Sequence, residues 1–349
     1  MADYAVIGMQ FGSEGKGGIT AHLASRFNFD AAACNFSPNA GHTVTIDGRK
    51  HVATSLPVTS IFPWCRWALL GPGAIIDLDK LEDELARVRD MRQWLSAFYA
   101  QKNESFTVVV HPNAAIVHAD HRLREADYVA LGSTMKGTAE AAIDRMQRTK
   151  GSRNIARDAM FPTGVVTHQA LYDYVMNSSQ HIMVEGCQGH SLSLYGSFYP
   201  YCTSRDTSIW QLLADVAWPR GRGMPTVVGA IRTYPIRVAN RYDADGNIIG
   251  TSGPCYPDQQ ETTFEAIGVP TEYTTVTKLP RRVFTYSHAQ VCEAFRINRP
   301  ELLYVSFMDY LPAGQQQNDF IHQVQKAGHG AHVRFASYGP DLLDMRELS

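Results

Sequence analysis

A glycine-rich turn near the N-terminus carries the residues best suited to chemistry. The apolar run 4–7 leads into it, and a helical pattern follows at 19–27. The turn contains Gly12, Ser13, Glu14, Gly15, Lys16 and Gly17. Backbone N–H groups in such a turn can approach a phosphate, and the next helix N-terminus adds a favourable partial charge. It is not a Walker A loop, because Gln10 and Gly17 occupy positions that the loop reserves for glycine and for serine or threonine. The turn alone therefore leaves phosphate binding and a merely tight turn equally open.

A second cluster of small and polar residues lies at positions 39–43. It consists of Asn39, Ala40, Gly41, His42 and Thr43. The small residues allow close approach of the backbone, and His42 could act as a general acid because its charge changes near neutral pH. Considered alone, such a pair of glycine and histidine is more often a β-turn with a surface histidine.

Regular elements must position these two clusters. Apolar runs at 107–110, 181–184, 227–231, 302–307 and 333–336 predict buried strands, with 333–336 as the last. Helical patterns alternate with them, for example at 77–95 and 171–176. This alternation indicates an α/β fold with a mostly parallel central sheet and flanking helices, whose ligands bind at the carboxyl ends of the strands. The segment 237–275 is rich in Gly, Pro, Asp and Asn and predicts long loops over the site. We expect one domain over residues 1–349.

Composition excludes several classes of protein. With 32 basic and 34 acidic residues the net charge is −2, so nothing favours nucleic acid or an anionic membrane as a partner. The six cysteines are scattered, without the paired spacing of a zinc site, which suits a reducing compartment. No signal peptide or long apolar span is evident, so we expect a cytoplasmic protein, in the host cytoplasm if it is encoded by a phage.

Taken together, the two clusters resemble the adenylosuccinate synthetase family. Other segments resemble family motifs in the same chain order, at 132–137, 144–148, 185–189, 199–204, 275–283 and 337–341. The resemblance spans nearly the whole chain, and six or more motifs in one order are highly specific. It implies a P-loop-NTPase-like core with long active-site loops. It also implies a homodimer with shared active sites, in which Arg148 reaches into the partner subunit.

The family joins L-aspartate to C6 of a purine nucleotide, after a nucleoside triphosphate has phosphorylated O6 with Mg²⁺ present. By resemblance, the catalytic residues would be Ser13, Lys16 and His42, with Ser13 and Gly41 at the metal. Triphosphate binding would involve Gly12, Ser13, Glu14, Gly15, Lys16, Gly17, Gly41, His42, Thr43, Arg281, Phe307, Asp309, Ser337, Gly339 and Pro340. The purine nucleotide would contact Ser13, Asn39, Ala40, Ser133, Thr134, Lys136, Arg148, Gln188 and Thr203. Aspartate would bind Thr275, Val276, Thr277, Arg281 and Arg282.

One departure from the family bears on the substrate. The family has aspartate where this chain has Ser13, and that aspartate takes the N1 proton and binds magnesium. Loss of a positioned base normally costs roughly 10²–10⁴ in rate. Serine is smaller and neutral, so it leaves room for the 2-amino group of guanine and can accept a hydrogen bond. This resembles a phage branch of the family that acts on dGMP with aspartate and ATP. The N1 proton could then pass to a substrate carboxylate, a phosphate or water.

Two further departures concern the nucleotides. Leu279 replaces an arginine that lies by the ribose in the family, which weakly favours a deoxynucleotide. Phe307 replaces the lysine of the guanine-reading segment while Asp309 remains, so ATP is at least as good a candidate as GTP. The alternatives are an ordinary synthetase that uses IMP with GTP and a nucleotide-binding regulator that has lost catalysis.

Two smaller groups of residues carry weaker expectations. His118, Asp120 and His121 could suggest a metal site, but no further ligand is near in sequence and surface polar residues are the commoner explanation. The arginines at 87, 89 and 92 are expected to form a solvated helix face.

Overall fold

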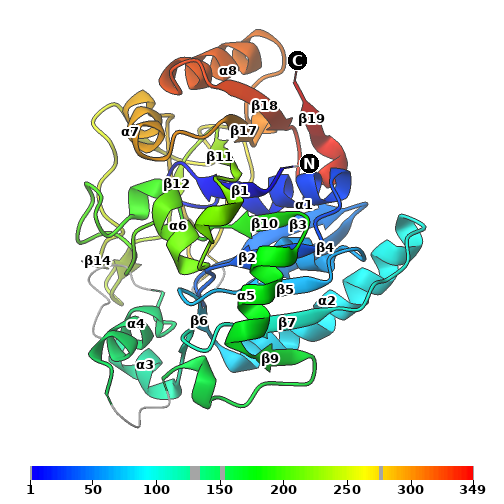
Figure 1. Ribbon diagram of the computed structural model, residues 1–349. Coiled ribbons are helices and arrows are strands. Elements are labelled where there is room, and N and C mark those ends of the chain that lie inside the picture. Colours follow the sequence, from blue (N-terminus) through cyan, green and yellow to red (C-terminus); the bar gives the residue numbers. More distant parts are fainter. Residues whose placement is uncertain (1, 126–133, 150–153, 275–277, 349) are drawn as a thin grey trace.

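A ten-stranded sheet forms the centre of the molecule (Figure 1). The computed structural model describes residues 2–125, 134–149, 154–274 and 278–348. In spatial order the strands are β19 (Met345–Glu347), β18 (His332–Ser337), β17 (Leu302–Ser306), β11 (Thr226–Arg232), β1 (Tyr4–Gly8), β10 (Ile182–Glu185), β2 (Ala31–Cys34), β5 (Trp67–Leu70), β7 (Thr107–Val110) and β9 (Val165–Thr167). All neighbouring pairs are parallel except β18 and β19. The predicted α/β fold with a mostly parallel sheet is confirmed.

The register brings the ends of the inner strands together. Val6 of β1 is paired with Glu185 of β10 on one side and with Val228 of β11 on the other. Glu185 in turn is paired with Cys34, the last residue of β2. Because these strands are parallel, the segments that follow Gly8, Cys34, Glu185, Arg232 and Ser306 all leave the same edge of the sheet. This edge is where the candidate site lies.

Helices cover both faces of the sheet (Figure 1). On one face, α1 (Lys16–Arg26) and α2 (Leu78–Phe98) share a buried apolar cluster with Val6. On the other, a second cluster with Ala5 and Ile7 contains residues of α5 (Gln169–Ser178), α6 (Ile209–Asp215), α7 (His288–Asn298) and α8 (Gln315–Ala327). Side chains of a strand alternate between its faces, so β1 contributes to both clusters.

Smaller elements surround this core. The helices α3 (Ala119–Arg124) and α4 (Thr138–Gln147) lie together beyond the sheet, where α4 packs on β6 (Ile75–Ile76) and β8 (Ala115–Ile116) (Figure 1). β3 (His42–Ile46) and β4 (Arg49–Ala53) form a hairpin against α1. The remaining short strands are β12 (Ile236–Arg237), β13 (Arg241–Tyr242), β14 (Ile248–Gly250), β15 (Glu261–Thr262) and β16 (Arg282–Phe284). The described part of the chain holds no helix long and apolar enough to cross a membrane.

Three expectations need correction. The segment 237–275 is not loop alone, because β13, β14 and β15 lie within it. The sheet does not end at 333–336, since β19 adds an antiparallel edge strand. Arg92 is not solvated: it is 2% exposed, and its guanidinium donates to five backbone carbonyl oxygens, including those of Ser60 and Phe62. These backbone carbonyl groups need hydrogen-bond donors, and one buried arginine supplies them.

Candidate active site

The glycine-rich turn is held from within by Glu14. This side chain is fully buried and accepts hydrogen bonds from the backbone N–H groups of Gln10 and Gly12, at 3.1 and 2.8 Å. Its second oxygen lies 2.8 Å from Lys16 Nζ, in an ion pair that is itself buried. The carboxylate therefore shapes the turn, and only the backbone of Glu14 remains to meet a ligand.

Ser13 lies at the exposed tip of this turn. Its backbone is left-handed, with φ of 60°, and Gly12 and Gly15 on either side also have positive φ. Positive φ is costly for most residues, whereas glycine adopts it freely and aspartate or asparagine tolerates it. Position 13 is thus one that an aspartate could occupy without disturbing the turn.

The second cluster packs directly against the turn. A Cβ atom added at Gly17 would lie 2.6 Å from the carbonyl oxygen of Thr43, so α1 and β3 touch through backbone atoms. His42, the first residue of β3, is thereby brought beside Lys16, whose charge contributes to lowering the pKa of His42. Gly41 is exposed, and the space around its Cα is open.

Gly17→Ala is expected to lower the unfolding free energy by about 1–3 kcal/mol and to displace His42, because backbone atoms of a strand cannot yield cheaply. The matched control is Gly18→Ala, whose Cβ would meet only ordinary contacts at 3.7 Å and which should stabilise α1 by up to about 1 kcal/mol. Denaturant unfolding measures both changes. Equal effects of the two substitutions would contradict the close packing at Gly17.

His42 faces a buried carboxylate. Its side chain is 7% exposed, and Nδ1 lies 3.8 Å from Oε2 of Glu185, with no hydrogen bond to a described residue. Glu185 is fully buried at the end of β10 and accepts from the backbone N–H groups of Val58 and Thr59, both at 3.0 Å. Burial lowers the pKa of His42 and Glu185 opposes that shift, so the carboxylate favours the imidazolium when charge develops nearby.

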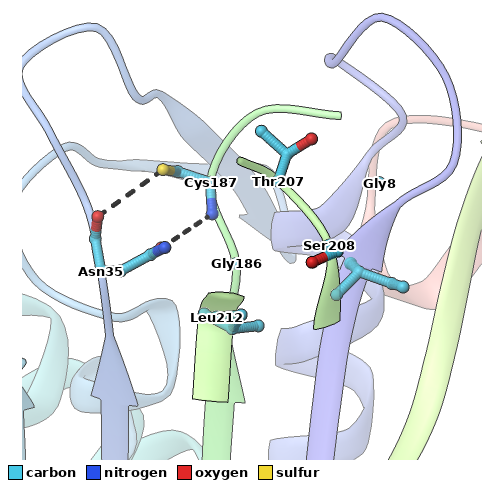
Figure 2. A pocket seen from close by; sticks show the side chains of 8 residues that line it. Gly8, Asn35, Gly186, Cys187, Thr207, Ser208 and Leu212 are labelled. Carbon is cyan, nitrogen blue, oxygen red and sulfur yellow. Dashed lines mark hydrogen bonds between the residues drawn. The ribbon is translucent and has the colours of Figure 1, made fainter. Parts of the chain in front are cut away.

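The loop after β10 closes the back of the turn. A Cβ at Gly189 would lie 2.4 Å from Gly12 N, and one at Gly8 would lie 2.7 Å from the carbonyl oxygen of Gln188. Figure 2 shows the small pocket behind this contact, where two hydrogen bonds join Asn35 and Cys187. Its volume of about 10 Å³ holds at most a water molecule, so this pocket is too small for a nucleotide.

A buried arginine ties the turn to two other segments. Arg232, at the end of β11, has a fully buried side chain and donates from Nη1 to the carbonyl oxygen of Ser13 at 3.2 Å. Its Nη2 lies 2.5 Å from Oε1 of Glu272, whose carbonyl accepts from the N–H of Arg281. The guanidinium also lies 3.9 Å from the ring centre of Phe307. One side chain thus contacts the glycine-rich turn, Glu272 and Phe307, the residue that follows β17.

Two neighbouring arginines have different surroundings. Arg282 forms a two-pronged ion pair with Glu261, at 2.8 and 2.6 Å, so its fork is already occupied. The guanidinium of Arg281 makes no hydrogen bond or ion pair to a described residue, and burial lowers its pKa. Of the two, Arg281 is therefore better placed to receive a carboxylate.

The remaining expected triphosphate residues, at positions 307, 309, 337, 339 and 340, follow β17 or lie at the end of β18 and just beyond it. Ser306 Oγ donates to the carbonyl oxygen of Glu14 at 3.0 Å, which places Phe307 and the exposed Asp309 next to the turn. Ser337 is buried and donates to the carbonyl oxygen of Gly339, while Pro340 is exposed.

The expected mononucleotide residues divide into three groups. Half-buried side chains lie at Asn39, Ala40, Thr134, Lys136, Gln188 and Thr203. Arg148 stands apart at the exposed end of α4, where it donates to the carbonyl oxygen of Met146. Ser133 lies outside the described residues, as do Thr275, Val276 and Thr277, which were predicted to bind aspartate.

Two metal expectations can be compared with the structure. Ser13 and Gly41 are both exposed, and a serine hydroxyl and a backbone carbonyl are hard oxygen donors that suit Mg²⁺ when substrate phosphates complete its shell. In the other cluster, Asp144 joins Asp120 and His121 as the third ligand that the sequence did not reveal. Asp144 is already bound by His121 and Arg124, at 2.9 and 2.8 Å, so this group is an ion-pair network.

The sequence did not reveal three residues of this region, Lys80, Arg232 and Glu272, and it gave Glu185 no role beyond its place in the motif 185–189. Glu185 and Arg232 are the last residues of largely apolar strands. A charge at the carboxyl end of a buried parallel strand was the available signal.

Comparisons with known proteins agree with this geometry. A family model described as adenylosuccinate synthetase matches residues 5–163 and 155–318. The chain is 37% identical to N6-succino-2-amino-2′-deoxyadenylate synthase of cyanophage S-2L, over 97% of this chain and 91% of the relative. Adenylosuccinate synthetase of Thermococcus sibiricus is 28% identical over 99% of both chains.

Solved structures give the same result. Succinoaminodeoxyadenylate synthetase of cyanophage S-2L, solved with dGMP and with dATP as an energy donor, superposes with a TM-score of 0.86 at 35% identity, covering 99% of this chain and 95% of that one. Adenylosuccinate synthetase of Plasmodium falciparum shares the fold, with a TM-score of 0.78 at 16% identity over the full length of both chains. The chain therefore belongs to the adenylosuccinate synthetase family of carbon–nitrogen ligases.

Proposed function

We propose that the protein joins L-aspartate to C6 of dGMP with hydrolysis of ATP, giving N6-succino-2-amino-2′-deoxyadenylate, ADP and phosphate. The observation that carries the proposal is the presence of Ser13, a small neutral residue, at the exposed tip of the glycine-rich turn. The names of the phage relatives support it, as does the dGMP bound to one of them. The product would supply the synthesis of 2-aminoadenine deoxynucleotides.

The reaction would proceed in two steps. The γ-phosphoryl group of ATP passes to O6 of dGMP, and the amine of aspartate then attacks C6 and displaces phosphate. The backbone of the turn and Lys16 would hold the triphosphate, and Mg²⁺, held by Ser13 and Gly41, would neutralise phosphate charge. His42 would donate a hydrogen bond to O6 as charge develops there, with Glu185 stabilising the imidazolium.

The choice between guanine and hypoxanthine would be made at position 13. A serine hydroxyl can accept a hydrogen bond from the 2-amino group of guanine, and an aspartate there would crowd that group. Arg232 donates to the backbone carbonyl of Ser13, which would hold the main chain at position 13 in place while its side chain meets the base.

The energy donor is proposed to be ATP. Phe307 presents a ring that is not selective for guanine, and Arg232 covers one face of that ring. The dATP bound to the cyanophage relative is consistent with an adenine nucleotide. Leu279 beside the aspartate loop would suit a deoxynucleotide substrate.

One experiment tests the proposed function directly. The protein is incubated with aspartate and Mg²⁺ and with each pairing of dGMP, GMP or IMP with ATP, dATP or GTP, and succinylated products are identified by mass spectrometry. We expect the highest kcat/KM with dGMP and an adenine nucleotide. Preference for IMP with GTP would indicate an ordinary synthetase, and binding without turnover in any pairing would indicate a regulator.

The protein is proposed to be a homodimer with shared active sites. Arg148 is exposed at the end of α4, away from the turn of its own chain, as a residue serving a partner subunit would be. Mixing equal amounts of the Arg148→Ala and His42→Ala proteins should restore up to about a quarter of the wild-type activity. About half of the dimers are then hybrids, and one of the two sites in each hybrid carries neither substitution. Activity assays after confirmed subunit exchange measure this, and absence of any rescue would contradict shared sites.

A further inference from the structure

Two cations pair with one buried carboxylate where α2 and α3 meet the segment before α4, and a third cation lies nearby. The side chain of Asp77, just before α2, is 4% exposed. Its Oδ2 lies 2.7 Å from Nη2 of Arg122 and 3.6 Å from Nζ of Lys80. Lys136 is the third cation: burial and then the charge of Lys80 lower the pKa of its ammonium group, so the two lysines lie near each other. Within the described residues, the group therefore carries an excess of two positive charges.

This arrangement is unfavourable for the protein alone. The two ammonium groups repel each other, and Lys80 lies in the first turn of α2, where the helix dipole disfavours a cation. Burial, reinforced by Lys80, lowers the pKa of Lys136 to about 8. An anion bound between the two lysines would remove both penalties.

The lysine pair lies next to the expected mononucleotide residues. Nζ of Lys80 donates to the carbonyl oxygen of Pro38 at 3.2 Å, immediately before Asn39. Lys136 follows Thr134 by two positions, and both Asn39 and Thr134 are half-buried. The glycine-rich turn, which is expected to bind the triphosphate, has its own lysine, Lys16, which is paired with Glu14.

We propose that Lys80 acts with Lys136 to bind the 5′-phosphate of the mononucleotide substrate. A phosphate monoester carries close to two negative charges at neutral pH, which matches the charge excess of the group. A carboxylate of aspartate carries one charge and would leave the excess half neutralised. The inference rests on the proposed function only in taking a purine mononucleotide as substrate, and it is independent of which base is preferred.

The test is steady-state kinetics of Lys80→Met, which keeps the length of the side chain and removes its charge. We expect KM for dGMP to rise about 10- to 100-fold, as for loss of a charged hydrogen bond, with kcat and the KM values of aspartate and ATP changed less than about threefold. Equilibrium binding should weaken for dGMP and stay unchanged for deoxyguanosine, which lacks the phosphate.

Two matched variants separate charge from packing. Lys80→Arg keeps the charge and should retain a KM for dGMP within about threefold of the wild type, whereas Lys102→Met removes an 81% exposed lysine and should change nothing. An unchanged KM for dGMP in Lys80→Met overturns the proposal and leaves a structural ion cluster. A rise confined to the KM of aspartate also overturns it, in favour of a carboxylate site. Were the wild type to use IMP instead, the proposed function would fail, and the same measurement on IMP would still test Lys80.

The pH dependence gives an independent readout. Lys136 is faced by Lys80 and Asp77 from α2, and Asp77 is shared with Arg122 of α3. Because phosphate favours the charged form of Lys136, binding is strongest below the free pKa of about 8 and is lost as pH rises through it. KM for dGMP should therefore rise between about pH 7 and 9.5, and Lys136→Arg should flatten that rise, since arginine stays charged. A rise of the same size in Lys136→Arg would contradict the role of Lys136.

Discussion

Replacing His42 by asparagine is expected to lower turnover about 100- to 10,000-fold while leaving dGMP binding largely intact. The imidazole is proposed to act on charge that develops at O6, so its contribution belongs to the transition state rather than to the bound substrate. The structure supports this role through its position, with Lys16 on one side and Glu185 at 3.8 Å on the other. Rapid-quench kinetics on bound dGMP and equilibrium binding measure the two quantities separately.

A second buried histidine in the same hairpin provides the control. His51 of β4 is 3% exposed and lies on the strand that pairs with β3, where it is opposite Val44. His51→Asn removes the same ring from the same hairpin without touching the turn, so it should cost stability but keep turnover within about threefold. If dGMP binding weakened in His42→Asn while turnover of bound substrate survived, His42 would be a positioning residue.

The central strands could be predicted because their sequences are apolar without interruption. Residues 107–110, 227–231 and 302–307 are rich in β-branched or aromatic side chains, and parallel strands buried on both faces require such runs. The strand β2 was not predicted, since its sequence is three alanines and a cysteine. Alanine has little preference for strands, so β2 exists because β10 and β5 pair with it on both sides. The edge strand β19 has the sequence Met-Arg-Glu and depends likewise on its partner.

The sequence predicts those parts of the candidate site whose residues lie close together in the chain. It does not predict the parts that form by contact between distant segments. The turn at 12–17 and the cluster at 39–43 each place several functional groups within a few residues, so their spacing is visible in the sequence. Arg232, Glu272 and Lys80 act through contacts between segments that are far apart in the chain, such as the 3.2 Å bond from Arg232 to Ser13. The prediction that Arg92 is solvated was wrong for the same reason, because the carbonyl groups that accept its hydrogen bonds belong to another segment of the chain.

The contacts of Arg232 also explain how a substitution at position 13 could be accommodated. The arginine bonds to the carbonyl oxygen of Ser13 and leaves the side chain of position 13 unconstrained. The left-handed backbone there is one that aspartate and asparagine adopt readily. A change of side chain at this position can therefore alter the substrate without altering the fold. A change in substrate preference on substitution can then be attributed to the side chain itself.

Ser13→Asp is accordingly expected to lower kcat/KM for dGMP about 10- to 100-fold and to shift preference toward IMP. The carboxylate would crowd the 2-amino group of guanine, and it would also supply a base for N1 and a further oxygen for Mg²⁺. In the wild type, hypoxanthine lacks the amino group and would leave the serine oxygen unpaired, which disfavours IMP by a similar factor. The measurement is kcat/KM for both nucleotides in both proteins, with unfolding curves to confirm equal stability.

Ser13→Asn separates the two effects of the carboxylate. Asparagine has nearly the same size as aspartate but cannot act as a base, so it should lose activity on dGMP without gaining activity on IMP. A gain on IMP in Ser13→Asp alone would then identify the carboxylate as the group that takes the N1 proton in the ordinary reaction. If the wild type already prefers IMP, or if neither substitution changes the ratio of dGMP to IMP, position 13 does not select the base. The first outcome would also overturn dGMP as the proposed substrate, whereas the second would leave the substrate in place and move the choice of guanine to another residue.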